Sequence, residues 1–351
     1  MVVSCSFVSI VLALPGSDGK SKSTQEVRDV LAGEIYGPKQ IRLVDAPEPE
    51  LDPGGSGQII FQPELSCLCG SDMLFFEQEH EEYKPRLGHS LHEMIGRVVA
   101  TNGERYQVND RVLCVPNDQN GLWERYCVDE NRAIPVDPRP VEEEALMAQP
   151  LGTVILAMQR VPPVLGQSVV VVGQGPMGQL FCATLRNLGA RQIIAVDKLG
   201  CRLQTSLKMG ATDVVDSSEV DPEEAVLGLT DGAGADLVIE VVGHTEQVLN
   251  LCVDLCRVDG TILFFGVPMN RIDQIEWRKL FWRRQNIVTS VGPDFRTDFP
   301  LAMQWIAEKR MDVSPLITHR YPLAEVQRAF DQYHARSDDG LKILLDFPSA
   351  Q

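Results

Sequence analysis

Two sets of residues in this 351-residue chain have the types and spacing of chemical sites. The first is Cys69-Gly70-Ser71-Asp72, followed 23 residues after the cysteine by His92-Glu93. Thiolate and imidazole are preferred ligands of zinc. A cysteine and a histidine taken alone are more often core residues than ligands. This set by itself therefore does not decide whether the two residues bind a metal or pack in the core.

The second set is the pattern Gly173-x-Gly175-x-x-Gly178, which directly follows an apolar run at residues 169–172. The first glycine permits a tight turn, the second lets the backbone approach a pyrophosphate, and the third allows close packing of a helix on the strand. Pro176 and Met177 would open that helix, whose free N–H groups would bind the pyrophosphate.

A second apolar run, residues 192–196, ends at Asp197. Asp197 is near the position, roughly 20 residues after the glycine pattern, at which an acid binds the ribose hydroxyls of a dinucleotide. An acid here repels a 2′-phosphate, so the sequence favours NAD over NADP. Lys198 and Arg202 follow closely and weaken that preference, because a nearby base can accommodate the phosphate.

The elements that must position these residues change character along the chain. Short apolar runs broken by Gly, Pro and Asp between about residues 29 and 135 predict an all-β unit. From about residue 168, continuously apolar strands alternate with helices, which indicates a parallel sheet covered on both faces. We expect strands at 169–172, 192–196, 235–242, 261–267, 286–291 and 342–346, and helices near 177–188, 201–209, 245–257, 299–308 and 323–333.

Composition limits the classes of partner. The formal net charge of −17 argues against nucleic acid and anionic membranes, which require a basic surface. Nine cysteines lack the paired spacing of a disulfide framework, which favours a reducing compartment, the cytoplasm. An apolar run at residues 7–14 has no preceding Lys or Arg and is too short for a membrane span, so we expect residues 1–29 to be a poorly ordered, disordered N-terminal extension or an over-extended gene start.

Cys69-Gly70-Ser71-Asp72 followed by His92-Glu93-x-x-Gly96-x-Val98 resembles the zinc-containing medium-chain dehydrogenase/reductase family, which includes alcohol, sorbitol and threonine dehydrogenases. The resemblance extends from about residue 30 to 347 and includes Asn109-Asp110-Arg111-Val112, Pro150-Leu151-Gly152-Thr153, Ile317-Thr318-His319 and Lys342. It implies an α/β chain with a GroES-like β-barrel catalytic domain, residues 30–152 and 293–351, and a Rossmann NAD-binding domain with a doubly wound parallel sheet, residues 153–292.

The resemblance also implies roles for individual residues. Cys69 and His92 would bind one catalytic zinc, with Glu93 as the acid beside the metal. Ser71 would contact the substrate oxygen, and Asp72 would orient His92. On the cofactor, Thr153 and Val267 would flank the nicotinamide, and Val242-Gly243 would line the adenosine side.

Four features depart from the family pattern. The segment Gly88-His89-Ser90-Leu91-His92-Glu93 interrupts the usual G-H-E, and the ligand is assigned to His92, with His89 as its rival, because Gly96 and Val98 keep their spacing from His92. The third ligand position falls on Gln149, a neutral amide, so Glu93 could move in to supply the missing charge. The four-cysteine lobe is absent, so no structural zinc is expected. Leu74 replaces a relay histidine, so the proton must leave through Ser71 and a cofactor ribose hydroxyl, or through water.

The sequence therefore predicts a zinc-dependent oxidoreductase that transfers hydride between NAD and a secondary alcohol or polyol, or the ketone. One alternative is a zinc-free NAD(P)H-dependent enone or quinone reductase of the same fold, which Gln149 supports. Another is a non-catalytic dinucleotide-binding protein. The family implies a homodimer or homotetramer, with the sheet edge near residues 286–291 as the expected interface.

Overall fold

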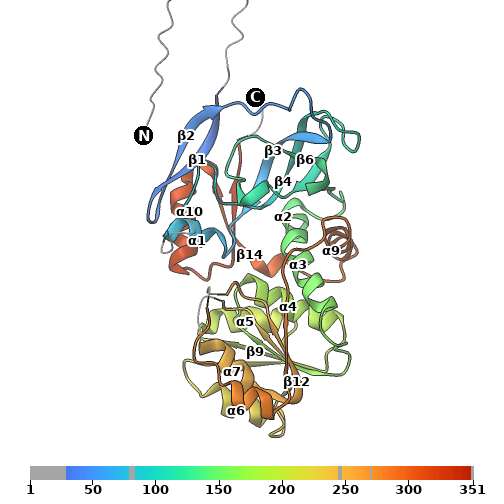
Figure 1. Ribbon diagram of the computed structural model, residues 1–351, viewed down its shortest axis with the longest axis vertical. Coiled ribbons are helices and arrows are strands. Elements are labelled where there is room, and N and C mark those ends of the chain that lie inside the picture. The colour runs from blue at the N-terminus through green and yellow to red at the C-terminus, as the bar shows by residue number, and fades with distance from the viewer. Residues whose placement is uncertain (1–28, 79–83, 244–246, 269–270, 349–351) are drawn as a thin grey trace, which may run out of the picture.

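The computed structural model describes residues 29–78, 84–243, 247–268 and 271–348, arranged in two lobes (Figure 1). Residues 1–28 of the expected N-terminal extension lie outside the described residues. Asp29, its last residue, already begins strand β1 (Asp29–Gly37), which pairs antiparallel with β2 (Gln40–Pro47).

The upper lobe in Figure 1 is built on a seven-stranded sheet of order β14-β15-β3-β4-β5-β7, with β6 paired to β3. Its strands are β3 (Gln58–Cys67), β4 (Glu93–Thr101), β5 (Arg111–Cys114), β6 (Tyr126–Asp129), β7 (Ala133–Pro135), β14 (Ile317–Pro322) and β15 (Lys342–Asp346). The chain therefore returns to this sheet at its C-terminal end. Helices α1 (Asp72–Glu77), α2 (Glu142–Leu146), α3 (Ala148–Gln159), α9 (Asp298–Ala307) and α10 (Val326–Ala335) complete the elements outside the second sheet.

The lower lobe holds six parallel strands in the order β10-β9-β8-β11-β12-β13. They are β8 (Ser168–Val172), β9 (Gln192–Asp197), β10 (Asp213–Asp216), β11 (Ala235–Glu240), β12 (Cys256–Phe264) and β13 (Asn286–Thr289). Its helices are α4 (Pro176–Asn187), α5 (Gly200–Lys208), α6 (Pro222–Leu229), α7 (Gln247–Leu255) and α8 (Trp277–Trp282). This is the order of the Rossmann fold, in which ligands bind where the winding reverses, here between β8 and β11. The predicted fold class is confirmed.

Some element boundaries differ from the expectation. The helix expected to reach residue 257 ends at Leu255, and Cys256 already begins β12. The strand expected over 235–242 ends at Glu240, whose side chain binds the backbone that follows. Strand β10 and helix α6 were not predicted, because the strand has four residues and only Val215 of it is buried.

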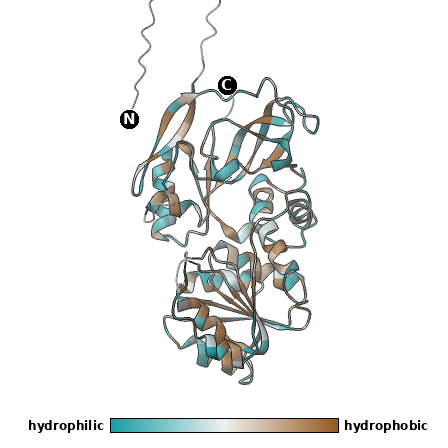
Figure 2. Cartoon of the chain, in the orientation of Figure 1, coloured by the Kyte–Doolittle hydropathy of each residue, from teal (hydrophilic) through white to brown (hydrophobic). Residues whose placement is uncertain are grey.

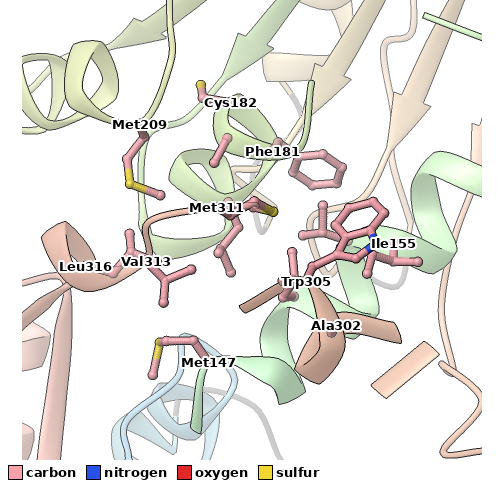
Figure 3. Close-up of a cluster of buried hydrophobic side chains, with 14 of the residues drawn as sticks. Met147, Ile155, Phe181, Cys182, Met209, Ala302, Trp305, Met311, Val313 and Leu316 are labelled. Atoms are coloured by element: carbon pink, nitrogen blue, oxygen red, sulfur yellow. The ribbon is translucent and has the colours of Figure 1, made fainter. Parts of the chain in front are cut away.

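One apolar core runs through both lobes. It joins Leu65 and Ile95 of the upper sheet to Val169 and Val171 of the lower sheet through helices α3, α4 and α9. Figure 3 shows Phe181 and Trp305 among the side chains of this cluster. Hydrophobic colour likewise follows the strands of the lower sheet in Figure 2. Because close-packed interiors resist deformation, this shared core fixes how the lobes face each other.

The helices are short. The longest two, α3 and α4, have 12 residues each. Over the described ranges, no helix has the length and apolar content needed to cross a membrane.

Candidate active site

Cys69, His92 and Glu93 come together in the upper lobe. One ligand atom from each lies within 4.8 Å of the other two. The pairing of β3 with β4 produces this arrangement, because it sets Cys67 opposite Glu93 and so brings the residues after β3 against those before β4. A thiolate, an imidazole and a nearby carboxylate are a donor set that suits zinc.

A buried ion pair lies behind this group. The Lys342 Nζ is 2.5 Å from Glu93 Oε2, and the Cys67 thiol donates to the same oxygen at 2.6 Å. Burial opposes the charge on Lys342, but Cys67 and Glu93 outweigh it and hold the pKa of Lys342 well above its usual value. Burial and the Glu93 charge raise the pKa of Cys67. Sequence reasoning gave Cys67 no role, and it noted Lys342 only as a family feature.

Asp72, expected to orient His92, lies close to its imidazole without a hydrogen bond to it. The Asp72 carboxylate accepts hydrogen bonds from the Cys69 backbone at 2.7 Å, and from the Ser90 hydroxyl and the Leu91 backbone at 2.8 Å each. His92 Nδ1 lies 4.0 Å from Asp72 Oδ1, at ion-pair distance but beyond hydrogen-bond distance, and has no hydrogen-bond partner among the described residues.

The interruption of the G-H-E motif explains this difference. Ser90 and Leu91 adopt positive φ angles of 102° and 63°, which directs the Ser90 hydroxyl and the Leu91 N–H to Asp72. Asp72 therefore orders the loop before His92 instead of bonding its imidazole. Non-glycine residues adopt such angles only when surrounding contacts hold them there.

The two candidate histidines occupy different surroundings. Both ring nitrogens of His89 lie close to Arg86, at 3.0 Å from its backbone nitrogen and 3.1 Å from its Nε. Burial and Arg86 lower the pKa of His89. Burial also disfavours charge on His92, but Cys69, Asp72 and Glu93 outweigh it and raise its pKa to about 9. This geometry favours His92 as the ligand.

Ser71 and Gln149 are the remaining residues that the sequence predicts beside a metal. The Ser71 hydroxyl is buried and has no hydrogen-bond partner in the described chain, which suits contact with an external oxygen. Gln149 is buried in the first turn of α3. Asp72 and Leu74 lie in α1, directly after Ser71.

The glycine turn lies between β8 and α4. Gly173 has a φ of +97°, and a Cβ on Gly178 would collide with the Gly173 carbonyl oxygen. Gly175 is the extended N-cap of α4, and a Cβ there would meet only Arg202, at 3.8 Å. The open side of Gly175 leaves space for a pyrophosphate beside Pro176 and Met177, the first residues of α4.

Asp197 ends β9, next to this turn. Its carboxylate accepts hydrogen bonds from the backbone of Gln174 at 2.6 Å and of Leu199 at 2.9 Å. Lys198 is exposed, whereas the Arg202 guanidinium faces Gly175. The acid and one base therefore both lie next to the glycine turn.

The other predicted cofactor residues lie at the ends of neighbouring strands or in α3. Val242 and Gly243 follow β11, and Val267 follows β12, its parallel neighbour. Val242 and Val267 are 45% and 44% exposed, unusual for valines next to a buried sheet. Thr153 in α3 donates to the Pro150 carbonyl at 2.7 Å.

Comparisons with known proteins agree with this arrangement. Residues 176–308 match a family described as zinc-binding dehydrogenase. The chain is 26% identical to an L-threonine 3-dehydrogenase of Shewanella putrefaciens (84% of this chain and 93% of the relative) and 27% identical to a sorbitol dehydrogenase of Halalkalibacterium halodurans (88% and 96%).

Solved structures extend the agreement to the fold. An alcohol dehydrogenase from Thermus sp. ATN1 superimposes with a TM-score of 0.81 at 21% identity, covering 92% of this chain and all of that one. Residues 176–308 are therefore similar to zinc-binding dehydrogenases, and the chain as a whole resembles the zinc-containing medium-chain dehydrogenase/reductase family. The resemblance drawn from the sequence is confirmed.

The matching family model is described as a zinc-binding dehydrogenase. Among the described residues, the group around Cys69 offers metal-ligand atoms close together, and the turn at Gly173 is the glycine-rich turn of the lower lobe. The Ser90-Leu91 loop and the amide at Gln149 are this chain's own departures. The roles of individual residues stay predictions, and they are the subject of the proposals below.

Proposed function

We propose that this protein is a zinc-dependent oxidoreductase that transfers hydride between NAD and a secondary alcohol or polyol, or the corresponding ketone. The observation that carries the proposal is the grouping of Cys69, His92 and Glu93 in a chain that also has a Rossmann glycine turn. The names of the similar proteins point the same way, since they are dehydrogenases of threonine, sorbitol and arabitol phosphate.

In this proposal, Cys69 and His92 would hold the zinc together with either Gln149 or Glu93. When bound, zinc would supply a Lewis acid that makes an alcohol easier to deprotonate, and NAD would accept the hydride. Ser71, whose hydroxyl has no hydrogen-bond partner in the described chain, would accept the alcohol proton while passing its own hydroxyl proton to a cofactor ribose hydroxyl or to water. Thr153 and Val267 flank the nicotinamide, and Val242-Gly243 contact the adenosine side.

The contacts of Glu93 favour Gln149 as the third ligand. Lys342 and Cys67 both bind Glu93 Oε2, and the Lys342 and Glu93 side chains are each 1% exposed. Moving this carboxylate fully onto the metal would strain a buried ion pair, which is expensive to break. We therefore assign Glu93 to the position beside the metal and the neutral amide of Gln149 to the metal itself.

For the cofactor, we propose NAD in preference to NADP. Asp197 ends β9 at the ribose position, and its charge would repel a 2′-phosphate. Arg202 is the base best placed to reduce this preference, because its guanidinium faces Gly175. We propose a single catalytic zinc and no structural zinc, since the sequence has no four-cysteine lobe.

We further propose a catalytic domain of residues 30–152 and 293–351 and a cofactor domain of residues 153–292, assembled as a homodimer or homotetramer. Strand β13 is an edge of its sheet, and an unpaired edge can pair with a second chain. Helix α8 exposes Trp277, Phe281 and Trp282 by 63%, 63% and 67%, as interface residues often are in a separated subunit. Light scattering during size-exclusion chromatography tests the oligomer.

The cysteines support a proposed cytoplasmic location. The eight cysteines among the described residues are all free. Free thiols persist in reducing compartments, whereas secreted domains usually pair them.

The zinc-free reductase is the second candidate, and Gln149 is the observation that favours it. Metal analysis of the purified protein, combined with NADH binding and a panel of alcohols, polyols, ketones and enones, separates the candidates. We expect bound zinc, NADH binding and alcohol oxidation that Cys69→Ala abolishes and Cys127→Ala leaves intact. Enone reduction that persists in chelator would establish the zinc-free reductase. NADH binding without turnover of any substrate would establish a non-catalytic protein.

A further inference from the structure

Glu240, the last residue of β11, binds the backbone of two different loops. Its Oε1 accepts hydrogen bonds from Val242 N at 2.8 Å and Gly243 N at 2.7 Å, directly after its own strand. Its Oε2 accepts from Gly266 N at 3.1 Å, after the neighbouring strand β12. The Glu240 carbonyl also accepts from the backbone of Phe265 at 3.0 Å and of Gly266 at 3.1 Å.

This carboxylate is unusual in its surroundings. Glu240 is 1% exposed, and burial raises the pKa of its side chain. The groups that oppose this rise are the N–H groups of Gly243, Val242 and Gly266, and no cation is among them. A buried acid held only by backbone donors costs free energy, so its retention indicates a positional role.

The two loops are in backbone contact at this point. A Cβ on Gly266 would collide with the Gly243 nitrogen, and a Cβ on Gly243 would lie 2.7 Å from the Val267 carbonyl oxygen. Gly243 also has a φ of +63°, in the region that favours glycine. Glu240 therefore lies at a contact that only glycines permit.

We propose that Glu240 is a positioning residue that fastens the adenosine-side loop, Val242-Gly243, to the nicotinamide-side loop, Gly266-Val267. The inference rests on the proposed cofactor site. The two loops follow β11 and β12, beside the point where the sheet winding reverses. Holding them together presets the spacing between the surfaces that meet the two ends of the dinucleotide, so less ordering is needed when it binds.

The test compares two ligands on Glu240→Gln. The amide keeps the shape but places an NH₂ donor against backbone donors, so the loops should separate. We expect the Kd for NADH to rise about tenfold, because one misdirected interaction at a preset site costs this order of affinity. ADP-ribose lacks the nicotinamide, and its Kd should rise much less. A merely structural defect would weaken both ligands equally.

Asp236→Asn is the matched control. Asp236 lies at the opposite end of β11 and accepts a backbone hydrogen bond from Ser168 at 2.8 Å. It should leave the ratio of the two dissociation constants unchanged, even if it lowers the melting temperature. If Glu240→Gln fails to fold, Gly266→Ala separates the same loops with the carboxylate intact, and the same ratio is measured.

The outcomes distinguish the inference from the function on which it rests. A wild-type protein that binds neither NADH nor ADP-ribose overturns both. A wild-type protein that binds both ligands, with Glu240→Gln and Gly266→Ala weakening them equally or not at all, overturns only the role of Glu240. Two results together support the role of Glu240. Peptides spanning 241–243 and 265–268 of Glu240→Gln should show faster amide exchange, and the variant should lose affinity for NADH selectively.

Discussion

The glycine turn of the cofactor site and the group of Cys69, His92 and Glu93, here called the metal pocket, are built from different parts of the chain. The turn is made of backbone: Gly173, Gly175 and Gly178 lie within six residues and leave an open helix terminus. The pocket is made of side chains, and its charge is balanced by Lys342, 249 residues away from Glu93. A backbone site depends on local geometry, whereas a pocket of charged side chains depends on distant partners that keep it neutral.

This difference predicts different responses to substitution. Substitutions in the turn should act through steric clash. Their effects should be limited to cofactor binding or to the packing of α4. Changes in the pocket should act through uncompensated charge, which destabilises the whole lobe because the interior cannot solvate it.

The largest effect should come from Lys342→Met. The substitution leaves the buried Glu93 carboxylate without its cation, which should lower the free energy of unfolding by about 3–5 kcal/mol. Urea denaturation of the metal-free protein measures this change. The double variant Glu93→Gln/Lys342→Met is the control and should recover most of the loss. A loss below about 1 kcal/mol, the range of exposed ion pairs, would contradict a charge-balanced pocket.

A smaller effect should distinguish two glycines of the turn. Gly178→Ala places a Cβ against the Gly173 carbonyl and should cost about 1–3 kcal/mol, as overpacking does. Gly175→Ala should leave thermal stability unchanged, because a Cβ there meets only Arg202 at 3.8 Å, but it should weaken NADH binding. Equal melting temperatures for the two variants would contradict the assignment of Gly178 to helix packing and Gly175 to cofactor binding.

The same contrast explains what the sequence could predict. The turn was predictable because its function follows from adjacent glycines: Gly173 has a φ of +97°, which favours glycine, and Gly178 leaves no space for a Cβ. Cys69 and His92 could be singled out by residue type. The contacts of Asp72 could not, because they depend on the path of the Ser90-Leu91 loop.

Glu240 was also beyond prediction, although its position carried a signal. An acid at the end of a continuously apolar strand suggests a buried role. Its partner Gly266, however, follows a different strand, and pairing between strands cannot be derived from their spacing in the sequence.

Ser90→Ala should change the zinc affinity of the metal pocket. Ser90 donates to the same Asp72 oxygen that lies 4.0 Å from His92 Nδ1. Without the hydroxyl, only the Leu91 N–H still donates to that oxygen, so it has a free lone pair for the imidazole. Zinc affinity should then rise about tenfold, the usual scale for partners of a ligand histidine. Competition with a chromophoric chelator measures the affinity.

Ser206→Ala is the control for Ser90→Ala, since the Ser206 hydroxyl is also buried but bonds Gln174 and Arg202 in the other lobe. Its zinc affinity should match that of the wild type. Zinc affinity that stays constant or falls in Ser90→Ala, with normal stability, would show that Ser90 supports the pocket instead of competing with His92.

The smallest effect should follow removal of the metal. The turn takes its geometry from β8 and α4, and the atoms that a Cβ on its glycines would meet belong to the turn itself, Arg202 and residues 241–242, all in the lower lobe. Extraction of zinc with a chelator should therefore abolish alcohol oxidation but change the Kd for NADH by less than about twofold, as for independent sites. Titration of NADH fluorescence before and after extraction measures this, and re-addition of zinc should restore oxidation. A large loss of NADH affinity on extraction would mean that the two halves of the site are coupled through the shared core of α3, α4 and α9.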